Sequence, residues 1–439
     1  MNARAETPDP SRLRRHFRWQ VISNLGVAAI GGVYLIFLGR VLGAQQFGLY
    51  ALVSAVATLA FASIDLRVHE ATVKFTSEWK TKRDETARSV AALLIVDCLS
   101  RLGVWLLLVL SIPVVSRLLL HESGWNGLLL VAYSGLLLSK LGNNWALGTL
   151  RAFGLFDWHA TVLLSSWMAK LFGTVVMFFT GTLDILSVLV MAYVCDVVAN
   201  AMAVVRATRE LRARRLLTSV RPVGFFGTPP AVRRFLFNGI GISLSDSLMR
   251  ELDTTIVGWN LPLEAVGVYR MSKNLLLLAY RAMDPVCTVL MPEFARLAAI
   301  GNYSEIMRIG FRVTRILFLV TLTALVCGFA LLPVLVPMLL GPQFSDVTRI
   351  TLIMLVGLLV GGPLLWSYAL WVAAGQMGMQ LRANVLAAVC AGTLFLVLTP
   401  WLKVTGAAVA FAVTVSLPFL LSFLLWQFRS QRYRQKPSL

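Results

Sequence analysis

The residues of this chain that could do chemistry are charged side chains inside long apolar stretches. They are Asp97, Arg101, Lys140, Lys170, Asp196, Asp246, Arg250, Asp253, Arg270, Lys273, Arg281 and Asp284, and cations outnumber carboxylates. An ionisable group at bilayer depth costs at least ~2.5 kcal/mol, so it normally faces a cavity or a partner. A net cationic cavity suits an anionic substrate, because Arg and Lys hold phosphate oxygens.

Residue spacing places several of these charges on single helix faces. Asp246, Arg250 and Asp253 follow one another at intervals of four and three, and Arg270 and Lys273 are three apart. At a rise of about 1.5 Å per residue, Asp246 and Lys273 fall near mid-membrane. The alternative reading is structural, because pairs at this spacing can simply neutralise each other within one helix.

We therefore predict two sets of site residues. The substrate-binding set is Arg250, Arg270, Lys273 and Arg281, with Arg101 and Lys140 facing them from the first half of the chain. The ion-coupling set is Asp246, Asp253, Asp97 and Asp196. Carboxylates near cations can exchange partners, titrate or bind Na⁺, which would link transport to an ion gradient.

Composition identifies the elements that must position these charges. The chain has 439 residues, of which 58% are hydrophobic and 14% charged, and its mean hydropathy is +0.76. These values exclude a single soluble domain. With about 20 apolar residues per crossing, we expect twelve membrane helices, near 18–40, 47–74, 88–116, 126–150, 158–180, 184–207, 234–258, 265–293, 306–338, 347–374, 382–399 and 405–428.

The distribution of positive charge predicts the orientation. The chain carries 40 Lys and Arg against 21 Asp and Glu. In a protein with many spans, such an excess marks cytoplasmic segments rather than nucleic-acid binding. Basic residues gather over 4–18, in a linker over 208–233 and in the tail after 428, so we expect both termini in the cytoplasm.

An internal repeat divides the chain in two. GRVLGAQQFGLY at 39–50 aligns with GWNLPLEAVGVY at 258–269, and GTVVMFFT at 173–180 aligns with GTLFLVLT at 392–399. The same step in numbering, called here the repeat offset, takes Gly39 to Gly258 and Gly173 to Gly392. Six crossings separate the copies, so both copies point the same way.

This repeat predicts the architecture. We expect an all-α polytopic membrane protein of two parallel six-helix halves around a central cavity. The expected segments are a basic N-terminus (1–17), a first half (18–207), a basic linker (208–233), a second half (234–428) and a tail (429–439).

No enzymatic motif is present. The sequence contains no Walker A loop, HExxH or GxSxG, and its four histidines are well separated. Its five cysteines show no paired spacing, so neither disulfides nor a zinc site is expected. We predict a protein that is not an enzyme and needs no cofactor.

The run from Gly39 to Tyr50, a helix that ends in GRVLG and resumes at FGLY, resembles the opening of the Wzx-type polysaccharide-transport flippases of the multidrug/oligosaccharidyl-lipid/polysaccharide exporter superfamily. Asp65, the segment at 341–344 and the segment at 373–375 agree with this family, whereas Arg67 stands where such proteins often have Gly. The resemblance implies flipping of an undecaprenyl-pyrophosphate-linked oligosaccharide across the bacterial inner membrane, by alternating access and with H⁺ or Na⁺ coupling. Polysaccharide assembly proteins are implied as partners.

Three other classes fit the sequence less well. A multidrug/cation antiporter of the same superfamily shares the repeat but should prefer an acidic or apolar cavity. A major-facilitator transporter should carry G-x3-D-x2-G-R after the second helix, where this chain reads FTSEWKTKRDETARS. A polysaccharide polymerase or ligase needs a large periplasmic loop, which the expected helices leave no room for.

Overall fold

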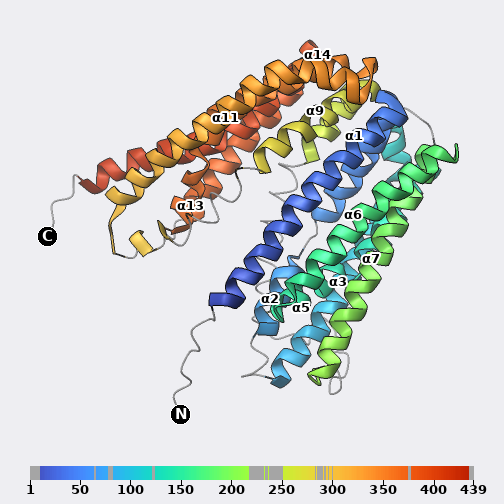
Figure 1. The fold of residues 1–439 in the computed structure, drawn as a ribbon, viewed down its shortest axis with the longest axis horizontal. Coiled ribbons are helices and arrows are strands. Elements are labelled where there is room, and N and C mark those ends of the chain that lie inside the picture. Colours follow the sequence, from blue (N-terminus) through green and yellow to red (C-terminus); the bar gives the residue numbers. More distant parts are fainter. Residues whose placement is uncertain are drawn as a thin grey trace. The chain divides into compact units, whose positions relative to one another are not determined.

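The computed structural model describes the chain except for residues 1–9, 64–65, 78–82, 121–123, 217–231, 233–235, 237–250, 282, 284–289, 291–292, 295, 299, 374–376 and 435–439. The part that it describes is helical and contains no strand (Figure 1). The chain divides into two compact units. The first unit is Met1–Tyr34 with Val53–Leu248, and the second is Leu35–Leu52 with Met249–Leu439.

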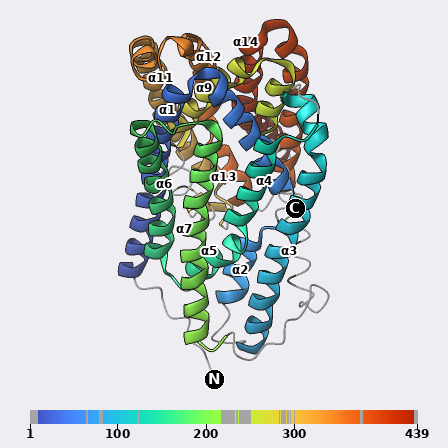
Figure 2. The same ribbon diagram turned by 90° about the vertical axis from the view of Figure 1, so that its right-hand side faces the viewer.

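The first unit is built from helices α1 to α7. Their bounds are α1 Pro10–Ser63, α2 Val68–Ser77, α3 Arg83–Val115, a π-helical turn Ser116–Leu120, α4 Gly127–Lys140, α5 Asn143–Ala152, α6 Phe156–Phe179 and α7 Ile185–Ala213. Helix α7 packs against α4, α5 and α6, and α2 packs against α3 and α5 (Figure 2). The core of the unit is apolar, with Trp145 and Leu93 fully buried at its centre.

The second unit is built from the middle of α1, a helical segment at 251–260, and helices α9 to α14. The bounds are α9 Leu263–Arg281, α11 Tyr303–Leu340, α12 Ser345–Gly361, α13 Trp366–Ala373 and α14 Met377–Arg434, with short 3-10 turns at Pro342–Phe344 and Gly362–Leu364. Helix α12 packs against α9, α11 and α14. Three tryptophans, Trp366, Trp371 and Trp426, form much of one apolar core.

Seven helical segments among the described residues are long and apolar enough to cross a membrane. Two of them contain a break, at Gly43 (φ 76°) in α1 and at Lys403 (φ 54°) in α14. The expected helix boundaries at 40–47 and 399–405 fall at these two breaks. The structure therefore shows a membrane protein with many spans, and the number twelve stays a prediction.

Two expected helices are interrupted. The stretch expected at 126–150 divides into α4 and α5 at Leu141 and Gly142, because Gly142 adopts a left-handed conformation (φ 70°). The amide of Asn200 donates a hydrogen bond of 2.9 Å to Leu141 O, which the break leaves without a helical partner. The stretch expected at 47–74 divides between α1 and α2, next to Arg67 (φ 49°). Broken backbone at membrane depth occurs where protein buries it or where it lines a cavity.

Gly48 of α1 and Gly267 of α9 touch within the second unit. A Cβ atom added to Gly48 would overlap Leu263 O, and one added to Gly267 would overlap Ala44 O. The repeat offset that takes Gly39 to Gly258 also takes Gly48 to Gly267 and Ala44 to Leu263. Gly48 therefore contacts the second copy of the repeat at the position equivalent to the one where Gly267 contacts the first copy.

A second pair of contacts is related by the repeat offset in the same way. A Cβ atom at Gly39 would overlap the methyl group of Met271, and one at Gly258 would overlap the side chain of Leu52. The repeat offset takes Leu52 to Met271, so these partners are again equivalent. Reciprocal contacts of this kind are those of a local two-fold axis, which passes between the segments 39–52 and 258–271.

Candidate functional site

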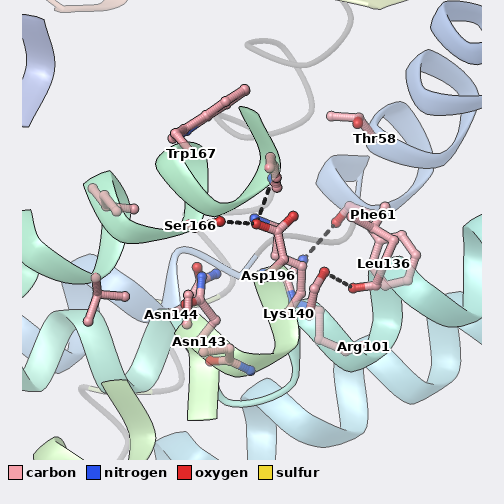
Figure 3. Close-up of a pocket in the computed structure, with 16 residues that line it drawn as sticks. Thr58, Phe61, Arg101, Leu136, Lys140, Asn143, Asn144, Ser166, Trp167 and Asp196 are labelled. Carbon is pink, nitrogen blue, oxygen red and sulfur yellow. Dashed lines mark hydrogen bonds and ion pairs between the residues drawn. The ribbon is translucent and has the colours of Figure 1, made fainter. Parts of the chain in front are cut away.

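A pocket of about 450 Å³ lies in the first unit, beside the break between α4 and α5 (Figure 3). Its charged lining residues come from four helices: Arg101 from α3, Lys140 from α4, Lys170 from α6 and Asp196 from α7. Its other polar lining residues are neutral amides and hydroxyls, among them Asn143, Asn144 and Ser166. The pocket thus has an excess of positive charge.

Lys170 and Asp196 form an ion pair inside this pocket. Lys170 Nζ lies 2.7 Å from Asp196 Oδ1, and Ser166 donates a hydrogen bond of 2.6 Å to the same oxygen (Figure 3). The ammonium also lies 4.7 Å from the ring centroid of Trp167, within the range of a cation–π contact. The lysine side chain is 10% exposed and the aspartate side chain 28% exposed.

Arg101 and Asp97 lie four residues apart on α3 and form an ion pair, and Asp97 has a second contact. Arg101 Nε lies 3.6 Å from Asp97 Oδ1, and Arg101 also donates to Phe61 O at 3.2 Å. Asp97 Oδ2 accepts a hydrogen bond of 3.3 Å from the backbone N–H of Trp145, in the first turn of α5. This carboxylate therefore also satisfies an N–H at the start of the broken helix.

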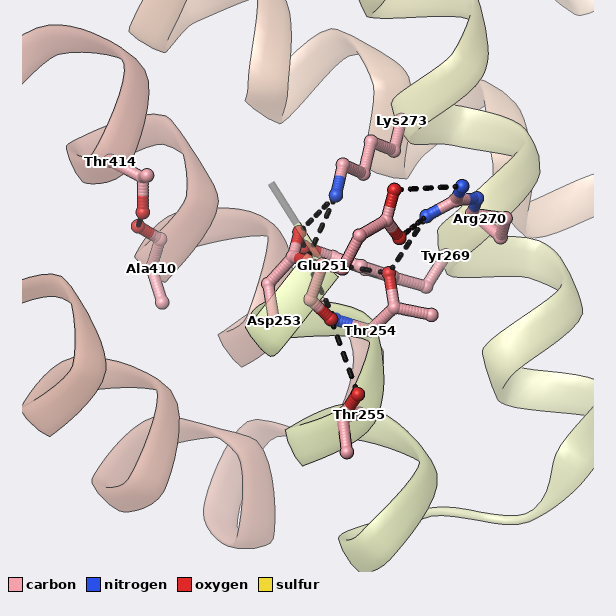
Figure 4. Close-up of polar contacts among 9 residues, drawn as sticks. All are labelled: Glu251, Asp253, Thr254, Thr255, Tyr269, Arg270, Lys273, Ala410 and Thr414. Atoms are coloured by element: carbon pink, nitrogen blue, oxygen red, sulfur yellow. Dashed lines mark hydrogen bonds and ion pairs between the residues drawn. The ribbon is translucent and has the colours of Figure 1, made fainter. Parts of the chain in front are cut away.

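A second polar cluster lies in the second unit (Figure 4). Lys273 Nζ is 2.8 Å from the carboxylate of Asp253, which also accepts 2.6 Å from the hydroxyl of Tyr269. Arg270 forms a bidentate contact with Glu251, at 2.6 and 3.3 Å. Lys273 and Asp253 are 3% and 5% exposed, so each charge is paired away from solvent.

The structure thus brings the predicted residues together in two groups, one in each unit. Arg101, Lys140 and Asp196 line the pocket, and Arg270, Lys273 and Asp253 share the second cluster. Asp97 lies behind Arg101, and Arg281, at the last turn of α9, is exposed. Asp246 and Arg250 lie outside the described residues.

The partners of these charges were not predicted from the sequence. Glu251 does not share the three-and-four spacing of Asp246, Arg250 and Asp253, and the one sequence signal at Tyr269 is its place in the repeat. The sequence indicates that Lys170 is an intramembrane charge, but its spacing places it in neither predicted set. Partners 16 to 30 residues apart, such as Tyr269 with Asp253 and Ser166 with Asp196, leave no periodic signal in one sequence.

The apolar helices and the polar pocket define a membrane protein with many spans. A family model described as polysaccharide biosynthesis protein matches residues 13–298, and the chain belongs to this family, a member of the multidrug/oligosaccharidyl-lipid/polysaccharide exporter superfamily. No curated protein matches the chain significantly.

Solved structures of flippases and exporters share the fold. A lipid II flippase MurJ in an inward closed conformation superposes with a TM-score of 0.72 at 12% identity, over 94% of this chain and 87% of that chain. An inward-facing multidrug resistance MATE family transporter gives 0.69 at 13% identity, over 95% and 96% of the two chains. A MATE transporter from Vibrio cholerae gives 0.59 at 15% identity, over 97% and 98%. The fold is therefore flippase-like and transporter-like.

Proposed function

We propose that this chain is a flippase that moves an undecaprenyl-pyrophosphate-linked oligosaccharide, an O-antigen or exopolysaccharide repeat unit, from the cytoplasmic to the periplasmic leaflet of the bacterial inner membrane. Membership of the polysaccharide biosynthesis protein family supports the class of substrate. The likeness to a lipid II flippase supports a lipid-linked cargo.

The observation that carries the proposal is the cationic pocket of the first unit. Arg101, Lys140 and Lys170 line it with a single carboxylate among the described lining residues, Asp196. A substrate that carries a diphosphate needs cationic donors of this kind, because each phosphate oxygen is an acceptor. Amide and hydroxyl groups in the same lining, such as those of Asn143 and Ser166, suit the adjoining sugars.

The proposed transport cycle is alternating access by two six-helix halves, with twelve crossings and both termini in the cytoplasm. In this scheme Arg250, Arg270, Lys273 and Arg281 contribute substrate contacts from the second half. Asp246, Asp253, Asp97 and Asp196 are the carboxylates proposed to couple flipping to H⁺ or Na⁺. Proteins of polysaccharide assembly are the expected partners.

Reconstitution tests the function directly. Proteoliposomes that contain an undecaprenyl-pyrophosphate-linked oligosaccharide are exposed to a membrane-impermeant glycosidase, which digests only glycan in the outer leaflet. We expect the protein to make the shielded glycan accessible, and Lys140→Met to slow this at least tenfold, because a phosphate oxygen loses its charged partner. Equal rates in protein-free vesicles would refute the proposal.

A multidrug/cation antiporter is the second candidate, and the MATE-like fold is the observation in its favour. The charge of the first-unit pocket argues against it, because Arg101, Lys140 and Lys170 repel a cationic drug. Efflux of a fluorescent organic cation from the same proteoliposomes, driven by a proton or sodium gradient, would favour the antiporter.

A further inference from the structure

We infer that Lys170 is a ligand of the substrate anion, and that Asp196 is a competitor built into the pocket, which holds Lys170 until an anion displaces it. The inference deepens the proposed function and rests on it only for the identity of the anion. The geometry of the pair and the charge of the surrounding pocket carry it.

The carboxylate is the partner that can leave. Asp196 is the more exposed of the two side chains, at 28% against 10% for Lys170. The contacts of Asp196 with Lys170 and Ser166 both end on Oδ1, at 2.7 and 2.6 Å. Lys170 keeps its contact with the ring of Trp167 when the carboxylate turns away. An oxyanion can therefore take the place of Oδ1 while the ammonium stays where it is.

The surrounding charges favour the exchange. Arg101 and Lys140 face the pair from α3 and α4, while α1 and α5 contribute neutral lining residues such as Thr58 and Asn143. Asp196 is the one carboxylate among the described residues of the lining. An incoming anion with two charges interacts with Lys140, with Lys170 and with Arg101, which Asp97 behind it already pairs at 3.6 Å, whereas Asp196 offers only one negative charge.

The exchange has a consequence at Asp196. Once displaced, Asp196 is a carboxylate beside a bound anion, so the two negative charges repel each other. A neutral side chain at position 196 neither holds Lys170 nor repels the anion, and should therefore raise the affinity of the pocket for an anion.

Sulfate binding to the full chain in nanodiscs of zwitterionic lipid tests the inference by calorimetry. We expect Asp196→Asn to bind sulfate about tenfold more tightly than wild type, and Lys170→Met about tenfold more weakly.

The matched control is Asp184→Asn, which removes a carboxylate from the N-terminal end of the same helix outside the pocket, where Asp184 accepts from Leu186 N. It should bind sulfate as wild type does. Weaker or unchanged binding by a folded Asp196→Asn would overturn the inference, and so would unchanged binding by a folded Lys170→Met. Sulfate binding requires no glycan, so the expected sulfate results with no flipping would refute the proposed function alone.

Discussion

At the scale of single residues, the pocket of the first unit and the polar cluster of the second unit differ in the solvent exposure of their charged side chains. Lys273 and Asp253 are almost completely buried and are held by Tyr269, whereas Asp196 is partly exposed in a pocket. A buried pair costs desolvation on both sides, and losing one partner leaves an uncompensated charge. Stability and transport can therefore be separated at the Lys273 pair by comparing single and double changes.

We predict that Lys273→Met alone destabilises the protein by about 3–5 kcal/mol, and that Lys273→Met with Asp253→Asn restores most of the loss. Thermal unfolding in detergent measures this. The matched control is the exposed pair Glu293 and Arg296, whose removal should leave the unfolding temperature almost unchanged. An equal loss in the single and double variants would contradict the prediction.

The double variant also tests the predicted substrate role of Lys273. If it is stable and still exports glycan, the pair is structural, and the substrate contacts lie elsewhere. If it is stable and inactive, the sequence-based assignment of Lys273 to substrate binding holds. Lys273→Arg should reduce export less than Arg270→Lys does, because the guanidinium of Arg270 donates to both carboxylate oxygens of Glu251. The ammonium of a lysine cannot reproduce this bidentate geometry.

At the scale of helices, the contact between Gly48 and Gly267 leaves no room for a side chain. We predict that Gly48→Ala and Gly267→Ala each cost about 1–3 kcal/mol or more, because the added Cβ would meet backbone oxygens. The two losses should be similar, since the contacts are exchanged by the repeat. Gly32→Ala is the control, because a Cβ there meets nothing within 4 Å. Unequal losses, or none, would argue against the two-fold relation.

Sequence alone predicted the breaks in α1 and α14 but not the break between α4 and α5. The apolar runs around Gly43 and Lys403 are each too long for one crossing, so a boundary had to lie there. KLGNNW at 140–145 sits within a run of one-crossing length and contains no proline, so nothing demanded a break. The break depends on distant groups, Asn200 and Asp97, which compensate the exposed backbone.

Pairing across helices is the second thing that the sequence could not supply. The spacing in the sequence indicates that Arg270 and Lys273 share a helix face, and the structure places both in one cluster. Which carboxylate each cation meets depends on how the segment at 251–260 is rotated against α9. That rotation is set by packing between the two helices, and one sequence holds no record of it.

At the scale of the whole molecule, the topology is the prediction to test. Cysteines introduced singly into the 208–233 linker and the tail after 428, in a background without the native cysteines, should react only with membrane-permeant maleimide in intact cells. A cysteine at Trp401, an 83% exposed residue beside the Lys403 break, should react with impermeant reagent if twelve crossings are correct. Reaction of the linker with impermeant reagent would overturn the topology and the parallel repeat together.

The exchanged contacts at Gly48 and Gly267 are also those of a symmetric dimer. An interface in which equivalent residues meet across a two-fold axis is the interface of a homodimer. Two identical half-length subunits would form the same surface, and in such a pair one change at the glycine would alter both sides of the contact at once. In a single chain the two sides can differ, and they do so elsewhere in the repeat, where Lys170 of the pocket corresponds to Val389, the position that the repeat offset pairs with it.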